Sequence, residues 1–389
     1  MTPWQARKRR WEGMARGRTL VGPQTVHIDL ANGCNTNCTT CWDHSPLLAT
    51  PRSAAWKRKI FDLERFVALA RDLAGMASVE SAILSGMGDP FVNPFIYDII
   101  AECKRQGWHV TVLTNALLAD PDRVAALGVD AMLVSVNGAS PASYAAFHPN
   151  LRASDFERLK ALLARWRALG VPVKHVQVIN RDTAPELVEM VEFAARYGAR
   201  QVTFKLASLG GGTEACAITE AQRVELRERL APEAAKAATR LGVATNLDVF
   251  GRQLAADGLA TTPIEEVGCF MGWHYARITV EGELLYCCAA TLRVGHLDWG
   301  PFSAQWRGAP WEAMRARLMA GAYAPACRQC GKFNQNVKLA AKVRERLGEA
   351  AYRRLTGRPP SDNAQEAALS AVETVTRADG GDYAATTDD

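Results

Sequence analysis

The sequence has no run of 18 apolar residues, so it predicts no membrane-spanning helix. Its basic residues 1–22 lack the apolar stretch of a secretory signal, which favours a cytoplasmic protein. The net charge is only +5, and so small a basic excess does not predict nucleic-acid binding. The 389 residues are 48% hydrophobic and 22% charged, a globular composition, and the length suggests about two or three domains.

Cysteine is the residue that this sequence has in excess. Ten are present, and eight of them fall into two groups that each contain a C-x-x-C spacing. The first group is Cys34, Cys38 and Cys41, and the second is Cys269, Cys287, Cys288, Cys327 and Cys330. In a reducing compartment, clustered thiols indicate metal ligands rather than disulfides.

Short apolar runs alternate with helical patterns between residues 25 and 242. Strands are predicted at Val26–Ala31, Glu80–Ser85, His109–Thr114, Asp130–Asn137, Val173–Asn180 and Gln201–Leu206. Helices are predicted at Asp62–Leu73, Pro94–Gln106, Phe156–Leu169, Pro185–Tyr197 and Glu220–Leu241. Such alternation predicts parallel βαβ units, and six of them suit an α/β fold with a partial (β/α)6 TIM-like barrel.

A different pattern follows residue 259 and predicts a small α+β domain. Arg277–Val280 and Glu283–Cys287 flank a turn and predict a hairpin, with helices at Pro310–Met319 and Lys332–Leu355. The expected organisation is therefore a basic helical extension (1–24), the barrel (25–258), the α+β domain (259–358) and a disordered tail (359–389). We expect the basic extension to be a solvated amphipathic helix.

The first cysteine group lies in a loop at the C-terminal end of the first predicted strand, where barrel enzymes place their chemistry. Three thiolates can hold three irons of a cubane cluster and leave the fourth iron open for a ligand. A structural zinc ion would need a fourth protein ligand. His27 or His44 could supply it, so a zinc loop is the alternative.

The spacing of Cys34, Cys38 and Cys41 resembles the motif of the radical S-adenosylmethionine (SAM) superfamily, although Thr40 replaces the usual aromatic residue. The segment 85–90 resembles the family's G-G-E-P segment, and later strand ends resemble its polar SAM-binding ends. The resemblance implies a [4Fe–4S] cluster that cleaves SAM to a 5′-deoxyadenosyl radical, which abstracts a substrate hydrogen. It also implies SAM contacts at Gly86, Gly88, Asp89, Thr114, Asn115, Ser135 and Asn137. Strand-end capping is the alternative role for each of these residues.

The second cysteine group resembles the twitch domain, a shortened form of the SPASM domain, through its C-x12-G-x4-C and C-x2-C spacings. The resemblance implies one auxiliary [4Fe–4S] cluster, used for electron transfer, with ligands Cys269, Cys287, Cys327 and Cys330. Cys288 could substitute for Cys287, but adjacent residues rarely both face one metal. A zinc ribbon is the alternative for this group.

Polar residues within the predicted strands are candidates for contacts with substrate or SAM where they face the inside of the barrel. His175 and Gln177 share one face of their strand, and Lys205 and Asp29 are candidate contacts of substrate or SAM on inward faces. An internal salt bridge is the alternative for Lys205 and Asp29. Cys216, in a glycine-rich loop, could return hydrogen to a substrate radical, as a thiol does in some radical SAM epimerases; an inert thiol is the alternative.

The substrate is the least determined feature. Only 33 residues precede Cys34, too few for a fused leader-peptide recognition domain. We therefore expect a small molecule of the sugar or aminocyclitol type, oxidised or epimerised in natural-product biosynthesis. The alternative is a peptide maturase with a separate leader-recognition protein. An external reductant such as flavodoxin or ferredoxin is expected in either case.

Overall fold

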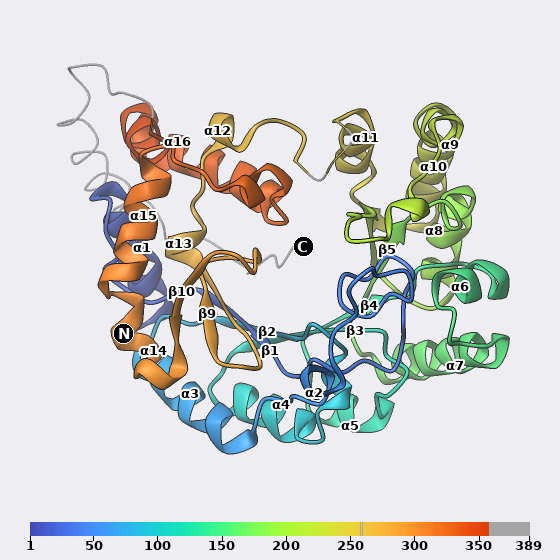
Figure 1. Ribbon diagram of the computed structural model, residues 1–389, viewed down its shortest axis with the longest axis horizontal. Helices are drawn as coiled ribbons and strands as arrows, with labels where there is room; N and C mark the ends of the chain where they lie inside the picture. The colour runs from blue at the N-terminus through green and yellow to red at the C-terminus, as the bar shows by residue number, and fades with distance from the viewer. Residues whose placement is uncertain (257, 259, 358–389) are drawn as a thin grey trace. The chain divides into compact units, whose positions relative to one another are not determined.

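Seven parallel strands form the sheet between residues 25 and 245 (Figure 1). They are β1 (Thr25–Asp29), β2 (Ser81–Ser85), β3 (His109–Thr114), β4 (Ala131–Ser135), β5 (Val173–Ile179), β6 (Gln201–Leu206) and β7 (Ala244–Thr245). The strands follow one another in chain order, and the pairs from β3 to β7 are parallel. All six predicted strands are confirmed, while the two-residue β7 was too short for a periodic signal.

This computed structural model describes residues 1–256, 258 and 260–357. The chain divides into two compact units. Within the described residues, the barrel unit comprises residues 28–66 and 82–261, and the terminal unit comprises residues 1–27, 67–81 and 262–357. The predicted domain limits stay a prediction, and the tail expected at 359–389 lies outside the described residues.

Helices connect the strands and cover the outer side of the curved sheet, where α4, α5 and α7 lie in Figure 1. From residue 54 to residue 256 the helices are α2 (Ala54–Lys57), α3 (Leu63–Gly75), α4 (Ile96–Arg105), α5 (Pro121–Ala126), α6 (Pro141–Phe147), α7 (Ala153–Leu169), α8 (Leu187–Arg196), α9 (Glu220–Glu225), α10 (Ala231–Leu241) and α11 (Leu247–Ala256). A π-helical turn, Leu226–Leu230, joins α9 to α10, so the long helix predicted there is interrupted.

Two short helices, α5 and α6, were missed although the sequence carries their start signals. Each begins with a capping side chain followed by proline, at Asp120-Pro121 and Ser140-Pro141. A helix of six or seven residues is too short to show a clear 3.6-residue period. The caps alone were therefore the available signal.

The two faces of β5 have different environments. Val178 lines a cavity on the inner side of the sheet, and Val176 packs with Leu133 in an inner apolar cluster. Because side chains alternate along a strand, His175 and Gln177 share the opposite face, as the sequence predicts. That face points toward α8, where the His175 ring lies 5.8 Å from that of Phe193. His175 and Gln177 therefore do not face the lumen.

His175 is fully buried among these apolar groups. Within the described residues, neither of its ring nitrogens has a hydrogen-bond partner. Desolvation by burial lowers the pKa of His175 to about 3. The folded protein consequently keeps this imidazole neutral at acidities where the unfolded chain would protonate it.

The terminal unit is the smaller α+β part. Its elements are α1 (Pro3–Ala15), α12 (Ile264–Val267), α13 (Met271–His274), β8 (Tyr275–Ile278), β9 (Glu283–Leu285), β10 (Arg293–His296), α14 (Phe302–Trp306), α15 (Ala309–Met319) and α16 (Phe333–Leu355). The predicted hairpin and the two predicted helices are confirmed as β8–β9, α15 and α16. The strand β10, antiparallel to β9, was missed. No helix of the described ranges has both the length and the apolarity to cross a membrane.

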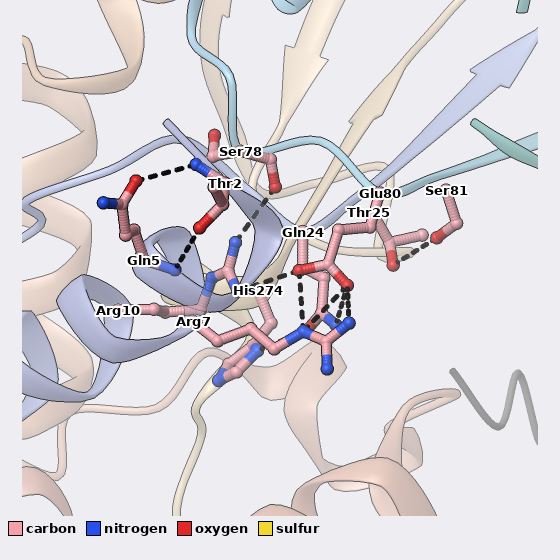
Figure 2. Close-up of polar contacts among 10 residues, drawn as sticks. All are labelled: Thr2, Gln5, Arg7, Arg10, Gln24, Thr25, Ser78, Glu80, Ser81 and His274. Atoms are coloured by element: carbon pink, nitrogen blue, oxygen red, sulfur yellow. Dashed lines mark hydrogen bonds and ion pairs between the residues drawn. The ribbon is translucent and has the colours of Figure 1, made fainter. Parts of the chain in front are cut away.

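The helix α1 is held by ion pairs to the segment before β2 (Figure 2). Arg7 lies 3.2 Å from the Glu80 carboxylate, and the buried Arg10 donates a 3.1 Å hydrogen bond to the Ser78 carbonyl. Gln24 donates to the same Glu80 carboxylate at 3.2 Å. The predicted helix is confirmed, but the expectation of a solvated helix is wrong at Arg10, because these acceptors and the Glu80 charge offset the cost of burying a guanidinium.

We expect the neutral His175 to make stability depend on pH. Its folded pKa lies below the unfolded value of about 6.5, so this contribution is complete above about pH 6.5 and is lost as the pH falls toward the folded value, at up to about 1.4 kcal/mol per pH unit. Urea unfolding between about pH 5 and pH 7 should show a shallower loss of stability toward acid for His175→Leu than for the wild type. Equal slopes would contradict a neutral buried His175.

Candidate functional site

A cavity of about 230 Å³ lies at the C-terminal ends of the inner strands of the barrel unit. All three cysteines of the first group line it, and so do all seven residues predicted to contact SAM. The lining residues are Cys34, Thr36, Cys38, Thr40, Cys41, His44, Ser85, Gly86, Met87, Gly88, Asp89, Leu113, Thr114, Asn115, Ser135, Asn137, Phe147 and Val178. Residues from six separate segments of the sequence therefore meet at one place.

The cysteine loop is held by a turn and by one threonine. The Cys41 amide donates to the Cys38 carbonyl at 3.0 Å, which closes a turn between two of the thiols. The Thr36 hydroxyl lies 3.3 Å from the Cys34 sulfur and 3.5 Å from the Cys38 sulfur. Burial raises the pKa of Cys38 to about 12 and also raises the pKa values of the other two thiols. Metal binding must therefore displace their protons.

Gly86 and Gly88 allow the turn after β2 to touch the backbone of the cysteine loop. The Gly88 amide donates to the Ala31 carbonyl, and the Asp89 amide donates to the Gly33 carbonyl, each at 3.0 Å. A Cβ atom on Gly88 would lie 1.8 Å from the Gly33 oxygen, and one on Gly86 would lie 2.2 Å from the Ala31 oxygen. These glycines are thus required by a backbone contact within the chain.

Asp89 ties the end of β2 to the end of β3. Its carboxylate accepts hydrogen bonds from the Thr114 hydroxyl at 2.7 Å, the Asn115 amide at 2.8 Å and the Phe91 amide at 2.9 Å. Burial raises the pKa of Asp89, while these three donors act in the opposite direction. These hydrogen bonds position Asn115, whose side-chain amide nitrogen lies 3.9 Å from the Cys34 sulfur.

Asn137 occupies a backbone position that few residues tolerate. Its φ is +53°, in the left-handed region where asparagine is enriched. Its side-chain oxygen accepts a 2.8 Å hydrogen bond from the Val178 amide, which links the ends of β4 and β5. Asn137 therefore stabilises the cavity wall as well as lining it.

His44 lies three residues beyond the cysteine motif and lines the cavity. Its Nε2 is 2.8 Å from the Asn32 carbonyl, and desolvation lowers the pKa of the ring. The neutral ring can donate this proton to the carbonyl, which fixes the loop against β1. From the sequence, His44 was expected only as a possible zinc ligand, and Met87 and Phe147 were missed. Met87 lies between the two glycines, which was the available signal for it; Phe147 carried none.

The second cysteine group lies in the terminal unit. Cys269 precedes α13, Cys287 and Cys288 follow β9, and Cys327 and Cys330 lie in and after the short turn Pro325–Gln329. Burial raises the pKa values of all four predicted ligands, to about 12 for Cys330, although for Cys287 the hydrogen bond with Cys288 is the largest cause.

Asn336, on α16, links two parts of this group. Its side-chain oxygen accepts from the Phe270 amide at 2.8 Å, next to Cys269, and its amide nitrogen lies 3.8 Å from the Cys330 sulfur. An amide hydrogen directed at a sulfur favours the ionised form of that sulfur. The arrangement therefore suits thiolate ligands.

Cys287 and Cys288 are the two candidates for one ligand position of the second cysteine group. The Cys287 sulfur accepts a hydrogen bond from the Ala289 amide at 3.4 Å. The Cys288 sulfur lies beside Gly331, 3.1 Å from where a Cβ atom of that residue would be. Besides burial, the charge of Cys288 is among the causes that raise the pKa values of Cys269, Cys327 and Cys330, so the structure does not favour Cys287 over Cys288, and the assignment of Cys287 stays a prediction.

Two protein-family models match this chain. Residues 28–194 match the radical SAM superfamily, and residues 269–331 match an iron–sulfur cluster-binding domain, SPASM. The chain is a radical SAM enzyme. The predicted family, the partial barrel and the SPASM-like second domain are thereby confirmed, and the predicted cofactors are those of the matched domains: SAM with a [4Fe–4S] cluster, and auxiliary iron–sulfur binding.

Relatives of this radical SAM enzyme carry different functional names. A PqqA peptide cyclase from Xanthomonas campestris pv. campestris is 25% identical over 280 residues, 70% of this chain and 69% of the relative. An AdoMet-dependent heme synthase from Methanosarcina barkeri is 23% identical over 312 residues, 74% and 83% of the two chains. Streptococcus suis SuiB bound to S-adenosylmethionine has a similar fold, with a TM-score of 0.59 and 16% identity over 80% of this chain and 71% of SuiB.

The residues present fit the clusters of a radical SAM enzyme. Within residues 1–256, 258 and 260–357, no three His, Cys, Asp or Glu side chains converge tightly enough to hold a single metal ion. A cubane has a different requirement, because each cysteine binds its own iron. The three thiols in one cavity, with Thr36 and Asn115 directed at their sulfurs, have the chemistry that such a cluster needs.

The other predicted residues of this radical SAM enzyme lie near the cavity but not on its surface. Asp29 is buried and accepts from the Ser85 hydroxyl at 3.4 Å, and Ser85 lines the cavity. Lys205 pairs in register with Val178, another lining residue, so it shares the inner face. The buried Cys216 thiol donates to the Thr39 carbonyl at 3.8 Å, at the cysteine loop. Their catalytic roles stay predictions.

Gly88→Ala should displace the cysteine loop, because its new methyl group would overlap the Gly33 carbonyl. A misplacement near 1 Å reduces catalysis by about 100-fold, so we expect SAM cleavage to fall by that order. The matched control is Gly251→Ala in α11, where a Cβ atom has no neighbour within 4 Å. Assays of 5′-deoxyadenosine formation would contradict this contact if both variants retained full activity.

Serine variants can distinguish Cys287 from Cys288. The background is Cys34→Ala/Cys38→Ala/Cys41→Ala, which leaves only the second group to bind iron. We expect Cys288→Ser to retain about four iron atoms per chain and Cys287→Ser to lose most of them, as measured by iron and sulfide analysis after anaerobic reconstitution. The reverse result would assign the ligand to Cys288.

Proposed function

We propose that this radical SAM enzyme abstracts a hydrogen atom from a peptide substrate and so modifies it. The observation that carries the proposal is the match of 70% of the chain to proteins named PqqA peptide cyclase. The sugar or aminocyclitol substrate that we expected from the sequence gains no comparable support. The peptide alternative is therefore preferred, with a separate leader-recognition protein as its partner.

The first cysteine group would hold a [4Fe–4S] cluster, which when bound supplies the electron that cleaves SAM. Cys34, Cys38 and Cys41 line the cavity, and three cysteine ligands would leave one iron of the cluster without a protein ligand. Polar side chains at the ends of β3 and β4 would orient SAM. Asn115 and Asn137 are fixed there by Asp89 and by the Val178 amide.

The inner face of β6 would contribute to substrate binding. Thr203 and Lys205 follow each other on that face, in register with Val176 and Val178. An ammonium group beside the cavity would attract a carboxylate, of which a peptide has at least one. Asp29, on β1, would act through Ser85, whose hydroxyl donates to its carboxylate.

The second cysteine group would hold an auxiliary cluster used for electron transfer. Four of its five cysteines would each bind one iron of the cluster, so no iron would be left to bind substrate. An external reductant such as flavodoxin or ferredoxin would supply the electron for SAM cleavage. Removal of a second electron from the substrate radical would then give an oxidised or crosslinked product.

A second candidate is the modification of a non-peptide substrate. It is favoured by the relative named AdoMet-dependent heme synthase, which matches 74% of the chain. The two candidates share the cleavage of SAM and differ in where the abstracted hydrogen comes from. An isotope experiment can therefore separate them.

Deuterium transfer should identify the substrate. The anaerobically reconstituted enzyme would be supplied with SAM, a reductant and a perdeuterated precursor peptide encoded beside its gene. We expect deuterium in 5′-deoxyadenosine, detected by mass spectrometry, because the radical removes a C–H hydrogen of the peptide. Transfer from a deuterated small molecule but from no peptide would refute the proposal.

The same assay has matched cysteine variants. Cys34→Ala should abolish 5′-deoxyadenosine formation, because the cluster would lose a ligand. Cys103→Ala should retain it, because Cys103 is a fully buried core residue of α4 outside both groups. Equal activity of the two variants would contradict cluster binding by the first group.

A further inference from the structure

Asn336 is a fully buried asparagine in the first turn of α16. Its side chain joins two segments of the second cysteine group. The Phe270 amide donates to its oxygen at 2.8 Å, and its nitrogen lies 3.8 Å from the Cys330 sulfur. Among the described residues, this nitrogen has no other hydrogen-bond acceptor. Because buried polar groups are nearly always hydrogen-bonded, the sulfur is the partner on which the side-chain amide depends.

The direction of the two hydrogen bonds is fixed by chemistry. A backbone N–H group can only donate, so the atom of Asn336 that faces Phe270 must be the side-chain oxygen. The side-chain nitrogen, which also can only donate, then faces Cys330. Asn336 thus presents a donor, rather than an acceptor, to a sulfur that the sequence predicts to be a cluster ligand.

Packing along α16 holds this donor in place. Phe270 is fully buried in an apolar cluster that includes Tyr352 of the same helix. Cys330 is tied to the start of the helix, because the Phe333 amide donates to its carbonyl at 3.0 Å. Asn336 lies between these two anchored segments, so its amide does not have to reorient when the charge of a bound cluster changes.

We propose that the Asn336 side-chain amide donates a hydrogen bond to the Cys330 sulfur of the auxiliary cluster and thereby raises the reduction potential of that cluster. Cys330 must ionise to bind iron, and a thiolate is a charged acceptor for this amide. Burial strengthens the interaction, because the local dielectric constant is lower than that of water.

The direction of the effect follows from charge. A reduced cluster carries one more negative charge than an oxidised one, so it accepts the same hydrogen bond more strongly. Hydrogen bonds to cluster sulfurs are among the factors that set the reduction potential. A higher potential would make the auxiliary cluster a better acceptor for an electron from a substrate radical, and this part of the inference rests on the proposed function.

The first cysteine group contains an amide with different surroundings. The Asn115 nitrogen lies 3.9 Å from the Cys34 sulfur, but it also donates to the Asn35 side-chain oxygen at 2.8 Å. Asn115 also lines the cavity, whereas Asn336 is fully buried. An amide with a nearer acceptor does not depend on the sulfur, so we expect the stronger hydrogen bond at the auxiliary cluster.

Asn336→Leu removes the donor at nearly constant size. In the Cys34→Ala/Cys38→Ala/Cys41→Ala background, the potential of the auxiliary cluster can be measured by electron paramagnetic resonance during a redox titration. We expect the midpoint to shift to a lower potential. The matched control is Asn334→Leu, which changes an exposed asparagine of the same helix, and no shift is expected.

Pulsed electron paramagnetic resonance separates this hydrogen bond from a purely structural role. The same background protein would be prepared with asparagine whose side-chain nitrogen is the heavier stable isotope, and its auxiliary cluster would be reduced. We expect the cluster signal to show a coupling to that nitrogen. The coupling should persist in Asn334→Leu and disappear in Asn336→Leu.

Asn336→Asp decides the case in which Asn336→Leu binds no iron, because its carboxyl group keeps an oxygen for the Phe270 amide. Its midpoint should fall more steeply with rising pH than that of the protein with Asn336, because an ionised carboxylate beside Cys330 opposes reduction. Unchanged midpoints, an equal shift in Asn334→Leu or the absence of the nitrogen coupling would overturn the proposal. None of these measurements uses a substrate, so a failure here is distinguishable from a failure of the proposed peptide chemistry.

Discussion

The contact between two backbones, the turn after β2 and the loop after β1, is the constraint on which the cavity depends. It consists of two hydrogen bonds, from the Gly88 and Asp89 amides to carbonyls of the cysteine loop, and it leaves no room for side chains at Gly86 and Gly88. The same turn carries Asp89, whose carboxylate is hydrogen-bonded to the end of β3. One turn therefore holds both the cysteine loop and this polar strand end in place. A cluster and a cosubstrate must be held in a defined relation, and this contact supplies it.

Much of this arrangement could be predicted from the sequence, and the exceptions have physical causes. The limits of His109–Thr114 and Gln201–Leu206 were predicted correctly, because both strands have apolar residues between clear turns. The three cysteines of the first group line one cavity, as their spacing suggested. The carboxylate of Asp89 could not be placed, because its partners Thr114 and Asn115 are 25 and 26 residues away and only the register of the strands brings them together.

Burial has opposite consequences for different polar groups in this chain. The cysteine thiols are buried with raised pKa values, and only a bound metal offsets the cost of ionising them. His175 is buried on the outer face with no compensating partner among the described residues, so it stays neutral and gives nothing to the site. Sequence alone showed polar residues on strands, but it could not show which face of β5 meets the lumen.

Substrate choice must depend on residues that the family motifs do not define. The cysteine spacing and the glycine turn belong to the generation of the radical, and this chemistry is the same whether the hydrogen donor is a peptide or a smaller molecule. Discrimination between substrates requires contacts that differ between them, and Thr203 and Lys205 on the inner face of β6 are the polar candidates for such contacts. Lys205, next to Val178 in the sheet register, has the charge to prefer an acidic partner. We therefore expect residues on that face, rather than the cluster ligands, to decide which substrate is bound.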